Sequence, residues 1–368
     1  MKGFLVKTIV WILKILYAPM KLRRTKKKIV WLSRQSSDMS LDIRMLSQTI
    51  YDFRPDVEQV FRLRRLRGEH DISLSYGFSL IKDMWELASA QIAVTDTYSI
   101  PLSCLKHKKG LEIIQIWHAL GAVKKFGLQS VGTPQGRDAR IAEWMSMHKN
   151  YDHIIAPSKA ASAYYSEAFG CDPERIVIAS LPRVDVILDG SSQKEAFLEL
   201  NPQFVGKKLF VYLPTFRKND IQYAEQLSDT FAHSEDTALI ISLHPLSRKK
   251  ASNRFGFNGN FTTYDLMKLA DGIITDYSAC SFEGALLNKP ILFFIPDFDA
   301  YSVEQGINTD ITLEMPSACF TDPRKLYEAV SDRYDFGALS AFADKYVEHK
   351  GIDNTEKLSK WICSFIKD

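Results

Sequence analysis

Basic side chains, histidines and hydroxyl groups recur in this sequence at one kind of position, directly after a short apolar run. Trp117-His118 follows the run 112–116, and Lys124 and Lys125 come soon after it. Later segments repeat the pattern, namely SLPRVD at 180–185, LPTFR at 213–217, LHP at 243–245 and TDYS at 275–278. Together they offer positive charge and N–H donors for phosphates, and a base for an incoming hydroxyl. These are the groups that phosphoryl transfer from a nucleotide requires.

The stretch Asp271–Tyr301 indicates which elements position such residues. The apolar runs 272–274 and 291–295 flank a helix-length segment, Ser278–Leu287, so the order is strand, helix, strand. That order predicts a βαβ unit and therefore a parallel sheet.

The start of this predicted helix carries small hydroxyl residues. Free N–H groups and the helix dipole make a helix N-terminus attractive to phosphate. Glu283 lies one turn further in, where its carboxylate could accept hydrogen bonds from a ribose. A plain α/β layer in which Ser278 and Ser281 only cap the helix fits the same pattern, so both interpretations stay open.

The rest of the chain also alternates between strand-like and helix-like runs. Strands are expected near 28–32, 57–63, 91–94, 112–116, 153–156, 175–178, 208–212, 238–242, 272–275 and 291–295. Helices are expected near 41–51, 79–89, 138–147, 158–169 (with Ser158 as N-cap), 222–233, 264–269, 322–331, 339–348 and 355–366. With a linker at Gly190-Ser191-Ser192, the pattern predicts two doubly wound α/β domains, 29–190 and 191–368, facing one cleft. Such sheets bind ligands at the carboxyl ends of their strands.

Composition narrows the function classes. The chain has 368 residues, enough for two domains, and 46% of them are apolar. A net charge of +3 does not suggest a general nucleic-acid binder. The five cysteines form no CxxC pair, so no zinc site or disulfide framework is expected and a reducing cytosolic setting fits. P-loop, GxGxxG and GxSxG motifs are absent, and the DxD-like Asp297-Phe298-Asp299 is interpreted as structural.

The N-terminal segment Phe4–Ala18 is apolar, but Lys7 and Lys14 interrupt it. Its uncharged runs are too short to span a bilayer, and no signal-peptide cleavage site follows. In a helix the lysines fall on one side, while Trp11 and aliphatic residues cover much of the rest. A basic block, Lys21–Lys28, comes next. We therefore predict that residues 1–28 bind an anionic membrane surface; the alternative is an ordinary helix packed on the core.

Five ordered motifs resemble those of the CDP-glycerol glycerophosphotransferases, a family that builds wall teichoic acid. They are QIWHALGAVKKFG, SLPRVD, YLPTFR, LHP and TDYSACSFEGALLNKPILFFIPDFDAY, within Lys109–Tyr301. The resemblance implies a GT-B fold with two Rossmann-like domains. In it the domain 29–190 would take the acceptor, and 191–368 would hold CDP-glycerol.

The resemblance also implies roles for single residues. His118 would be the general base, and His244 a second required histidine at the donor phosphates. Independently of the resemblance, we hypothesise that Lys124 and Lys125 offset pyrophosphate charge on the acceptor, and nothing in the sequence demands a metal or a cofactor. Further contacts to CDP-glycerol are implied at Ala119, Leu120, Gly121, Ala122, Arg183, Pro214, Thr215, Ser242, Leu243, Ser278 and Glu283.

Three positions depart from the family pattern. Ala119-Leu120 replaces a usual Gly-Thr, Ala279 replaces a serine, and Glu283 stands where aspartate is common. The form WHALGAVKKFG looks more like the short primase branch. A primase would move glycerol phosphate from CDP-glycerol to an undecaprenyl-diphosphate-linked GlcNAc-ManNAc disaccharide, releasing CMP. It would do so as a peripheral protein on the cytoplasmic face of the cell membrane.

Other functions share these motifs. A poly(glycerol phosphate) or ribitol phosphate polymerase belongs to the same family, and a user of CDP-ribitol would carry every motif quoted above. A sugar-transferring GT-B enzyme would have similar architecture. A non-enzymatic, membrane-bound nucleotide sensor would keep Ser278 and Glu283 but would have little need for both histidines.

Overall fold

The computed structural model describes residues 2–66, 74–134, 136–217, 219–243, 247 and 255–368. The chain divides into two compact units. Unit 1 comprises Met1–Ala119, Lys125–Asp185 and Gly351–Asp368, and unit 2 comprises Leu120–Lys124 and Val186–Lys350.

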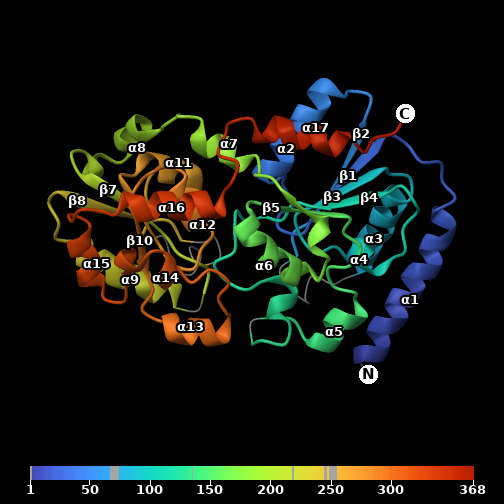
Figure 1. Cartoon of the computed structure of the whole chain (residues 1–368), viewed down its shortest axis with the longest axis horizontal. Helices are drawn as coiled ribbons and strands as arrows, with labels where there is room; N and C mark the ends of the chain where they lie inside the picture. The colour runs from blue at the N-terminus through green and yellow to red at the C-terminus, as the bar shows by residue number, and fades with distance from the viewer. Residues whose placement is uncertain (1, 67–73, 135, 218, 244–246, 248–254) are drawn as a thin grey trace. The chain divides into compact units, whose positions relative to one another are not determined.

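Unit 1 is built on a six-stranded sheet in the order β2-β1-β3-β4-β5-β6, with every neighbouring pair parallel (Figure 1). Its strands are β1 (Lys28–Ser33), β2 (Glu58–Leu63), β3 (Ile92–Thr95), β4 (Glu112–Gln115), β5 (His153–Ala156) and β6 (Ile176–Ile178). Its helices are α1 (Lys2–Met20), α2 (Leu41–Phe53), α3 (Leu74–Leu87), α4 (Ile100–Cys104), α5 (Ala139–Trp144), α6 (Lys159–Phe169) and α17 (Asn354–Cys363). The strand order reverses between β1 and β3, which is where such sheets bind ligands.

Unit 2 has a five-stranded parallel sheet in the order β11-β10-β9-β7-β8. The strands are β7 (Lys208–Leu213), β8 (Thr237–Ile241), β9 (Gly272–Thr275), β10 (Ile291–Phe294) and β11 (Cys319–Phe320). The helices are α8 (Lys194–Leu200), α9 (Asp220–Phe231), α11 (Thr263–Leu269), α12 (Cys280–Ala285), α13 (Phe298–Glu304), α14 (Ile311–Glu314), α15 (Pro323–Ala329) and α16 (Phe336–Tyr346). α7 (Arg183–Leu188) crosses from unit 1 to unit 2. Here the order reverses between β7 and β9.

Local sequence explains most of these elements. The central strands are apolar and fully buried, as β3 and β9 show, because helices cover both faces of a parallel sheet. Ser158 caps α6 as predicted, since its side chain accepts a hydrogen bond from the amide of Ala161. The predicted helix after β9 is shorter than expected and spans only Cys280–Ala285.

The last helix belongs to unit 1, whereas we expected all closing helices in the second domain. Leu358 and Ile362 of α17 are buried in one core with Ile43 and Leu46 of α2. The two helices lie side by side in Figure 1, although more than 300 residues separate Leu46 from its partner Ser359. The carboxylate of Asp185 caps the start of α17 by accepting from the amides of Asn354 and Thr355. This tertiary packing has no signal in the local pattern.

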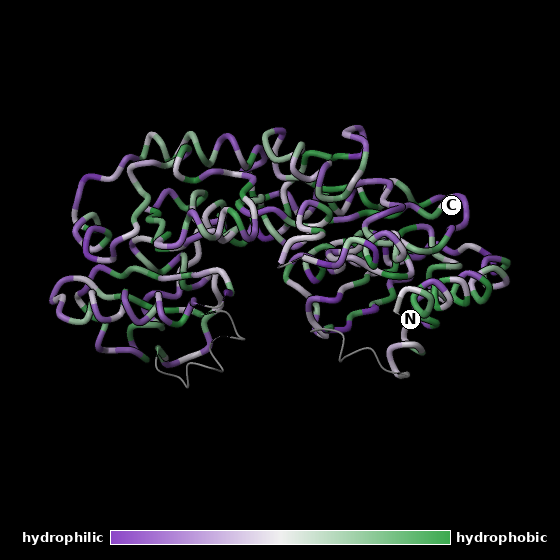
Figure 2. The backbone as a smooth tube through the Cα atoms, turned by 90° about the horizontal axis from the view of Figure 1, so that it is seen from below, coloured by the Kyte–Doolittle hydropathy of each residue, from purple (hydrophilic) through white to green (hydrophobic). Residues whose placement is uncertain are grey.

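α1 packs on unit 1 through one face only. Val10, Leu13 and Tyr17 are buried with side chains of α3 and α4. Large apolar side chains cover its outer face and are 40–81% exposed, namely Phe4, Leu5, Ile9, Trp11, Ile12, Ile15 and Leu16. Figure 2 shows this helix as mostly hydrophobic with hydrophilic interruptions. By length and composition alone, its segment Gly3–Met20 would suffice to cross a bilayer.

Lys7 of α1, and Lys21 directly after it, lie against aromatic rings of unit 1. The ammonium of Lys7 is 5.1 Å from the centre of the Trp144 ring, and that of Lys21 is 5.9 Å from the Tyr17 ring. The basic block also ends inside the fold. Lys28 is the first residue of β1, is buried, and pairs with Glu86 at 2.6 Å. The sequence had suggested that the segment 1–28 is separate from the first domain. In the structure it is instead part of unit 1.

Candidate functional site

His118 follows β4, at the carboxyl edge of the sheet in unit 1. The turn is fixed by the buried side chain of Gln115, whose oxygen accepts from the amide of Trp117 at 2.9 Å. Trp117 has a positive φ of 54° and its ring lies 3.9 Å from that of His118. A side chain in this backbone region is rare and is usually held by function or by its surroundings.

The hydrogen bond of His118 determines which ring nitrogen can act as a base. Its Nδ1 lies 2.9 Å from the backbone carbonyl oxygen of Asp96. Because a carbonyl only accepts, Nδ1 carries the proton in this contact and Nε2 keeps a lone pair. That is the tautomer in which a histidine accepts a proton from a hydroxyl.

Arg183 contacts the backbone of this histidine. Its guanidinium donates to the carboxylate of Asp42, and its NH1 donates to the carbonyl oxygen of His118 at 3.1 Å. The backbone amide of Arg183 also donates to Asp42, at 2.9 Å. Both side chains are largely buried, so this contact fixes the turn that carries His118. The predicted contact between Arg183 and CDP-glycerol stays a prediction.

A cavity of about 290 Å³ opens beside His118, entirely within unit 1. Loops after three neighbouring strands line it, with Arg34 after β1, Tyr98 after β3, and Trp117 after β4. Gly127, Ser130, Arg137 and His148 complete much of the wall. Burial lowers the pKa of His148 to about 3, so this second histidine is neutral at physiological pH. The sequence motifs did not point to Arg34, Arg137 or His148.

Leu120–Lys124, which come soon after His118, belong to unit 2, although the sequence placed them in the first domain. The carbonyl of Ala122 accepts from Thr309 Oγ1 at 3.0 Å, and that of Val123 accepts from the amide of Asn308 at 2.9 Å. Gly121 has a φ of +106°, and a Cβ there would lie 2.5 Å from the ring of Phe282. Only glycine fits this close approach. Leu120 and Ala122 are buried, and Ala119 belongs to unit 1.

The predicted donor residues of unit 2 gather on the loops after its strands. Pro214 and Thr215 follow β7, and Ser278 follows β9, on the two sides of the point where the strand order reverses. The amide of Thr215 donates to the carboxylate of Asp276 at 2.8 Å, which ties these two loops together. Ser242 and Leu243 follow β8. His244 lies outside the described residues.

α12 carries two of the predicted contacts. The Oγ of Ser278 accepts from the amide of Cys280, the first residue of this six-residue helix, at 3.3 Å, but the N-cap residue is Ala279 and, among the described residues, no side chain caps the helix. The carboxyl group of Glu283 is nearly fully buried and accepts from the Tyr264 hydroxyl at 3.4 Å. The contacts of Ser278 and Glu283 with CDP-glycerol stay predictions.

A buried ion-pair cluster connects these loops. Arg217 lies between Asp276, 2.9 Å away, and Asp297, and is itself 8% exposed. The Tyr277 hydroxyl donates to Asp297 at 3.0 Å, and the Tyr277 ring stacks on that of Tyr301 at 3.9 Å. Asp297, from the DxD-like segment, thus has a structural set of partners. The cluster links the ends of β7, β9 and β10.

The two candidate acceptor lysines differ in environment. Lys124 belongs to unit 2, where burial lowers its pKa and the nearby Asp276 opposes that shift. Lys125 belongs to unit 1 and is exposed. Their assignment to an acceptor pyrophosphate stays a prediction, and Lys124 lies nearer to the predicted donor loops.

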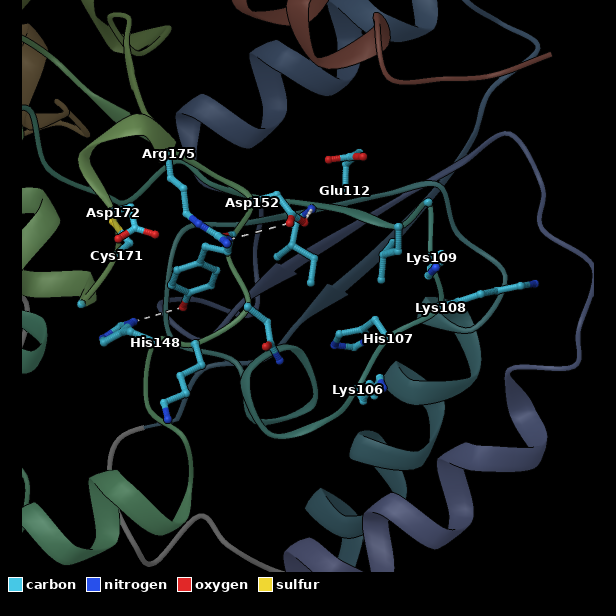
Figure 3. Close-up of a pocket in the computed structure, with 17 residues that line it drawn as sticks. Lys106, His107, Lys108, Lys109, Glu112, His148, Asp152, Cys171, Asp172 and Arg175 are labelled. Atoms are coloured by element: carbon cyan, nitrogen blue, oxygen red, sulfur yellow. Dashed lines mark hydrogen bonds and ion pairs between the residues drawn. The ribbon is translucent and has the colours of Figure 1, made fainter.

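A larger cavity of about 620 Å³ lies elsewhere in unit 1 (Figure 3). It is formed by residues just before β4 and β5, such as Lys109 and Asp152, and Figure 3 shows Arg175 reaching toward Asp152. None of the residues predicted for the site lines it. Because parallel sheets bind ligands at the carboxyl ends of their strands, the smaller cavity at His118 is the better candidate.

Comparison with known proteins identifies the family. The CDP-glycerol:poly(glycerophosphate) glycerophosphotransferase family matches residues 16–364. The chain belongs to this family. It is therefore a glycerophosphotransferase of teichoic acid biosynthesis, and the resemblance seen in the motifs is confirmed.

Two curated relatives illustrate the similarity. The teichoic acid ribitol-phosphate primase of Bacillus spizizenii is 30% identical over 309 residues, 79% of each chain. The teichoic acid glycerol-phosphate primase of Bacillus subtilis is 26% identical over 296 residues, 78% of this chain and 77% of the relative.

Solved structures show the fold. The wall teichoic acid polymerase TagF superposes with a TM-score of 0.72 at 18% identity, over 99% of this chain and 97% of that one. A Staphylococcus aureus MnaA-UDP structure gives a TM-score of 0.60 at 13% identity, covering 94% and 98%. The predicted α/β, GT-B-like fold class is confirmed by the likeness to TagF.

Proposed function

We propose that this glycerophosphotransferase is a primase, which transfers one glycerol phosphate from CDP-glycerol to an undecaprenyl-diphosphate-linked GlcNAc-ManNAc disaccharide. The observation that carries the proposal is the set of primases among its relatives, including the one from B. subtilis at 26% identity. The cavity beside His118 supports it, because an acceptor hydroxyl needs a base, and the contact of Nδ1 with the carbonyl of Asp96 makes Nε2 the basic nitrogen of the neutral ring.

The proposed step is a direct transfer between the two substrates. Nε2 of His118 accepts the proton of the acceptor hydroxyl as its oxygen attacks the glycerol-bearing phosphorus. The bond from this phosphorus to the bridging oxygen breaks, and CMP leaves with the electron pair. On the donor side, backbone amides and hydroxyls after β7 and β9 would hold the diphosphate, with Glu283 at the ribose.

CDP-ribitol is the second candidate donor. The relative from B. spizizenii, a ribitol-phosphate primase, is 30% identical to the chain. The two donors share the cytidine and both phosphates, so the contacts considered above would serve either one.

One experiment tests both donors. The purified enzyme is incubated with synthetic lipid-linked disaccharide and either CDP-glycerol or CDP-ribitol. The masses of the products are then measured by mass spectrometry. A single added glycerol phosphate is the expected product. A ladder of additions would make the chain a polymerase, transfer only from CDP-ribitol would change the donor, and no transfer from either would reject the proposed reaction.

We also propose that the outer face of α1 binds the cytoplasmic face of an anionic membrane, where the acceptor lipid resides. Seven large apolar side chains of α1 are exposed, which is costly in water and favourable in a lipid interface. Basic residues adjoin the end of α1, since Lys21 donates to the carbonyl of Lys106 and Lys108 donates to that of Arg23. Their charge complements anionic headgroups.

Substitution tests this better than deletion, because deletion of 1–28 would also remove the buried Val10, Leu13, Tyr17 and Lys28. Trp11→Ser combined with Ile15→Ser should reduce sedimentation with vesicles that contain phosphatidylglycerol. Leu200→Ser combined with Val205→Ser, exposed apolar positions in unit 2, is the matched control. Equal sedimentation of the two double variants would reject this orientation of α1.

A further inference from the structure

Arg34 occupies an unusual position at the end of β1. Its side chain lines the cavity that contains His118, and its NH1 donates to the carbonyl of Tyr98 at 3.3 Å. Its Nε is fully buried and has no hydrogen-bond partner within the described part of the chain. A buried, unsatisfied guanidinium nitrogen is costly, and such a group calls for an explanation such as a ligand.

Arg137 approaches the same cavity from the loop before α5. Its guanidinium lies 5.9 Å from the centre of the Tyr98 ring, and that of Arg34 lies 5.7 Å from the same centre. Neither arginine forms an ion pair with any carboxylate in the described ranges. Burial lowers the pKa of Arg34, and the positive charge of Arg137 lowers it further. Two guanidinium groups thus lie near one aromatic ring, and no carboxylate among the described residues pairs with either of them.

Two other arginines of unit 1 that lie at or near strand ends form ion pairs. Arg62 binds Asp83 at 2.6 Å, and Arg183 binds Asp42. Both arginines therefore have a carboxylate partner in the fold itself. Arg64, which follows β2, has no carboxylate partner in the described ranges either, but its guanidinium donates to the carbonyl and the hydroxyl of Ser75. Arg34 differs because its buried Nε has no hydrogen-bond partner among the described residues, which points to an anionic ligand.

We propose that Arg34 and Arg137 bind a phosphate group of the acceptor and so place the acceptor hydroxyl at His118. This inference rests on the proposed function, because it names the part of the acceptor that the same cavity recognises. Guanidinium groups match phosphate oxygens with paired N–H donors. The remaining wall suits a sugar, since Thr97 and Ser130 offer hydroxyls and Trp117 and Tyr98 offer ring faces.

The lipid-linked acceptor carries its phosphates as a diphosphate between sugar and lipid. The donor also carries phosphates, so an experiment must separate the two sources. Two synthetic probes do this, a GlcNAc-ManNAc disaccharide on a short alkyl diphosphate and the same disaccharide on an uncharged alkyl chain. Inorganic pyrophosphate serves as a third probe, for an anion without a sugar.

Binding of each probe is measured by calorimetry, without donor, for the full chain and its variants Arg34→Gln, Arg137→Gln and the double variant. Arg140→Gln is the matched control, because Arg140 is exposed, lies three residues after Arg137, and does not line the cavity. We expect the parent to prefer the diphosphate probe by about tenfold or more, the usual effect of a charge-assisted contact. The control should keep this preference and the double variant should lose it.

Steady-state kinetics then show whether the phosphate that the two arginines bind belongs to the acceptor or to the donor. The double variant should raise KM for the diphosphate acceptor while KM for CDP-glycerol stays within about twofold of the parent. A rise confined to the CDP-glycerol KM would overturn the inference, as would a double variant that still prefers the diphosphate probe. Pyrophosphate that binds as tightly as the full probe would reduce the site to a simple anion site and would also overturn it.

Failure of the proposed function has a different signature. If the parent enzyme transfers nothing from either donor, the proposed reaction is rejected. Calorimetry still decides in that case whether the two arginines bind the diphosphate probe. Thermal unfolding of every variant controls for folding. If loss of the buried Arg34 side chain unfolds the chain, the exposed Arg137→Gln variant alone carries the test.

Discussion

The strand-end loops of the two units hold their positive charge in opposite ways. In unit 2, Arg217 is buried between Asp276 and Asp297, so its charge is neutralised by the chain itself. In unit 1, Arg34 and Arg137 share a cavity with His118 and have no carboxylate partner among the described residues. A compensated cluster makes a rigid support, whereas an uncompensated one needs an anionic ligand.

This difference fits two different tasks. The loops after β7 and β9 of unit 2 are tied to each other through Asp276, which suits a preformed site for a nucleotide. The cavity of unit 1 offers a base, two cations and ring faces, which suits an acceptor that brings sugars and phosphate. The predictions below test each side of the comparison, beginning with the largest expected effect.

Arg217→Met should cost about 3–5 kcal/mol of unfolding free energy, because it leaves two carboxylates near a buried site without their cation. Urea unfolding measures this loss. Arg140→Met removes an exposed arginine and should change stability by less than about 0.5 kcal/mol. If both variants unfold at the same urea concentration, the cluster is not the support described above.

His118→Ala should lower turnover by about a hundredfold or more, since the reaction loses its general base. The Kd for CDP-glycerol should hardly change, because most of the predicted donor contacts, all except Ala119 and Arg183, belong to unit 2. His233→Ala, an exposed histidine of unit 2, is the control. A stable His118→Ala enzyme with normal kcat would remove His118 from the mechanism, and a parallel loss of donor affinity would place it at the donor instead.

The backbone carbonyl of Asp96 accepts a hydrogen bond from His118. The carboxyl group of the same residue should make the stability of the fold depend on pH. Burial raises the pKa of its carboxyl group to about 6, and one of its carboxylate oxygens has no hydrogen-bond partner in the described ranges. Between about pH 4 and 6 the folded chain keeps a proton that the unfolded chain releases. Stability should therefore fall as pH rises through this range, by up to about 3 kcal/mol.

Asp96→Asn removes that proton, so urea unfolding from pH 4 to pH 7 should show a smaller decline for the variant than for the parent. Turnover of the variant should remain measurable, because Asp96 binds His118 through its backbone carbonyl and not its carboxylate. Identical pH profiles of stability would show that the carboxyl group titrates as an ordinary exposed one.

Sequence patterns located the sheets well and the cavity poorly. His153–Ala156 and Gly272–Thr275 matched the observed strands because buried parallel strands are continuous apolar runs between polar turns. The two-residue β11 was missed, since Cys319-Phe320 is too short to form a pattern. Arg34 and Arg137 are about a hundred residues apart, and only the reversal of strand order brings their loops to one cavity. Such pairs depend on topology, which single-residue motifs do not encode.

The smallest expected effect concerns Glu283 in unit 2. Its buried carboxylate either binds a ligand or only stabilises α12. If it accepts ribose hydroxyls, Glu283→Ala should weaken binding of both CDP-glycerol and CMP by about 1–3 kcal/mol, the cost of a lost charged hydrogen bond. Tyr264→Phe removes the hydroxyl that donates to this carboxylate at 3.4 Å and leaves the carboxylate in place, so it should affect CMP binding less. Calorimetry with CMP separates the two roles. Unchanged CMP affinity in Glu283→Ala, together with a lower melting temperature, would make Glu283 a structural residue and leave the ribose to other groups of unit 2.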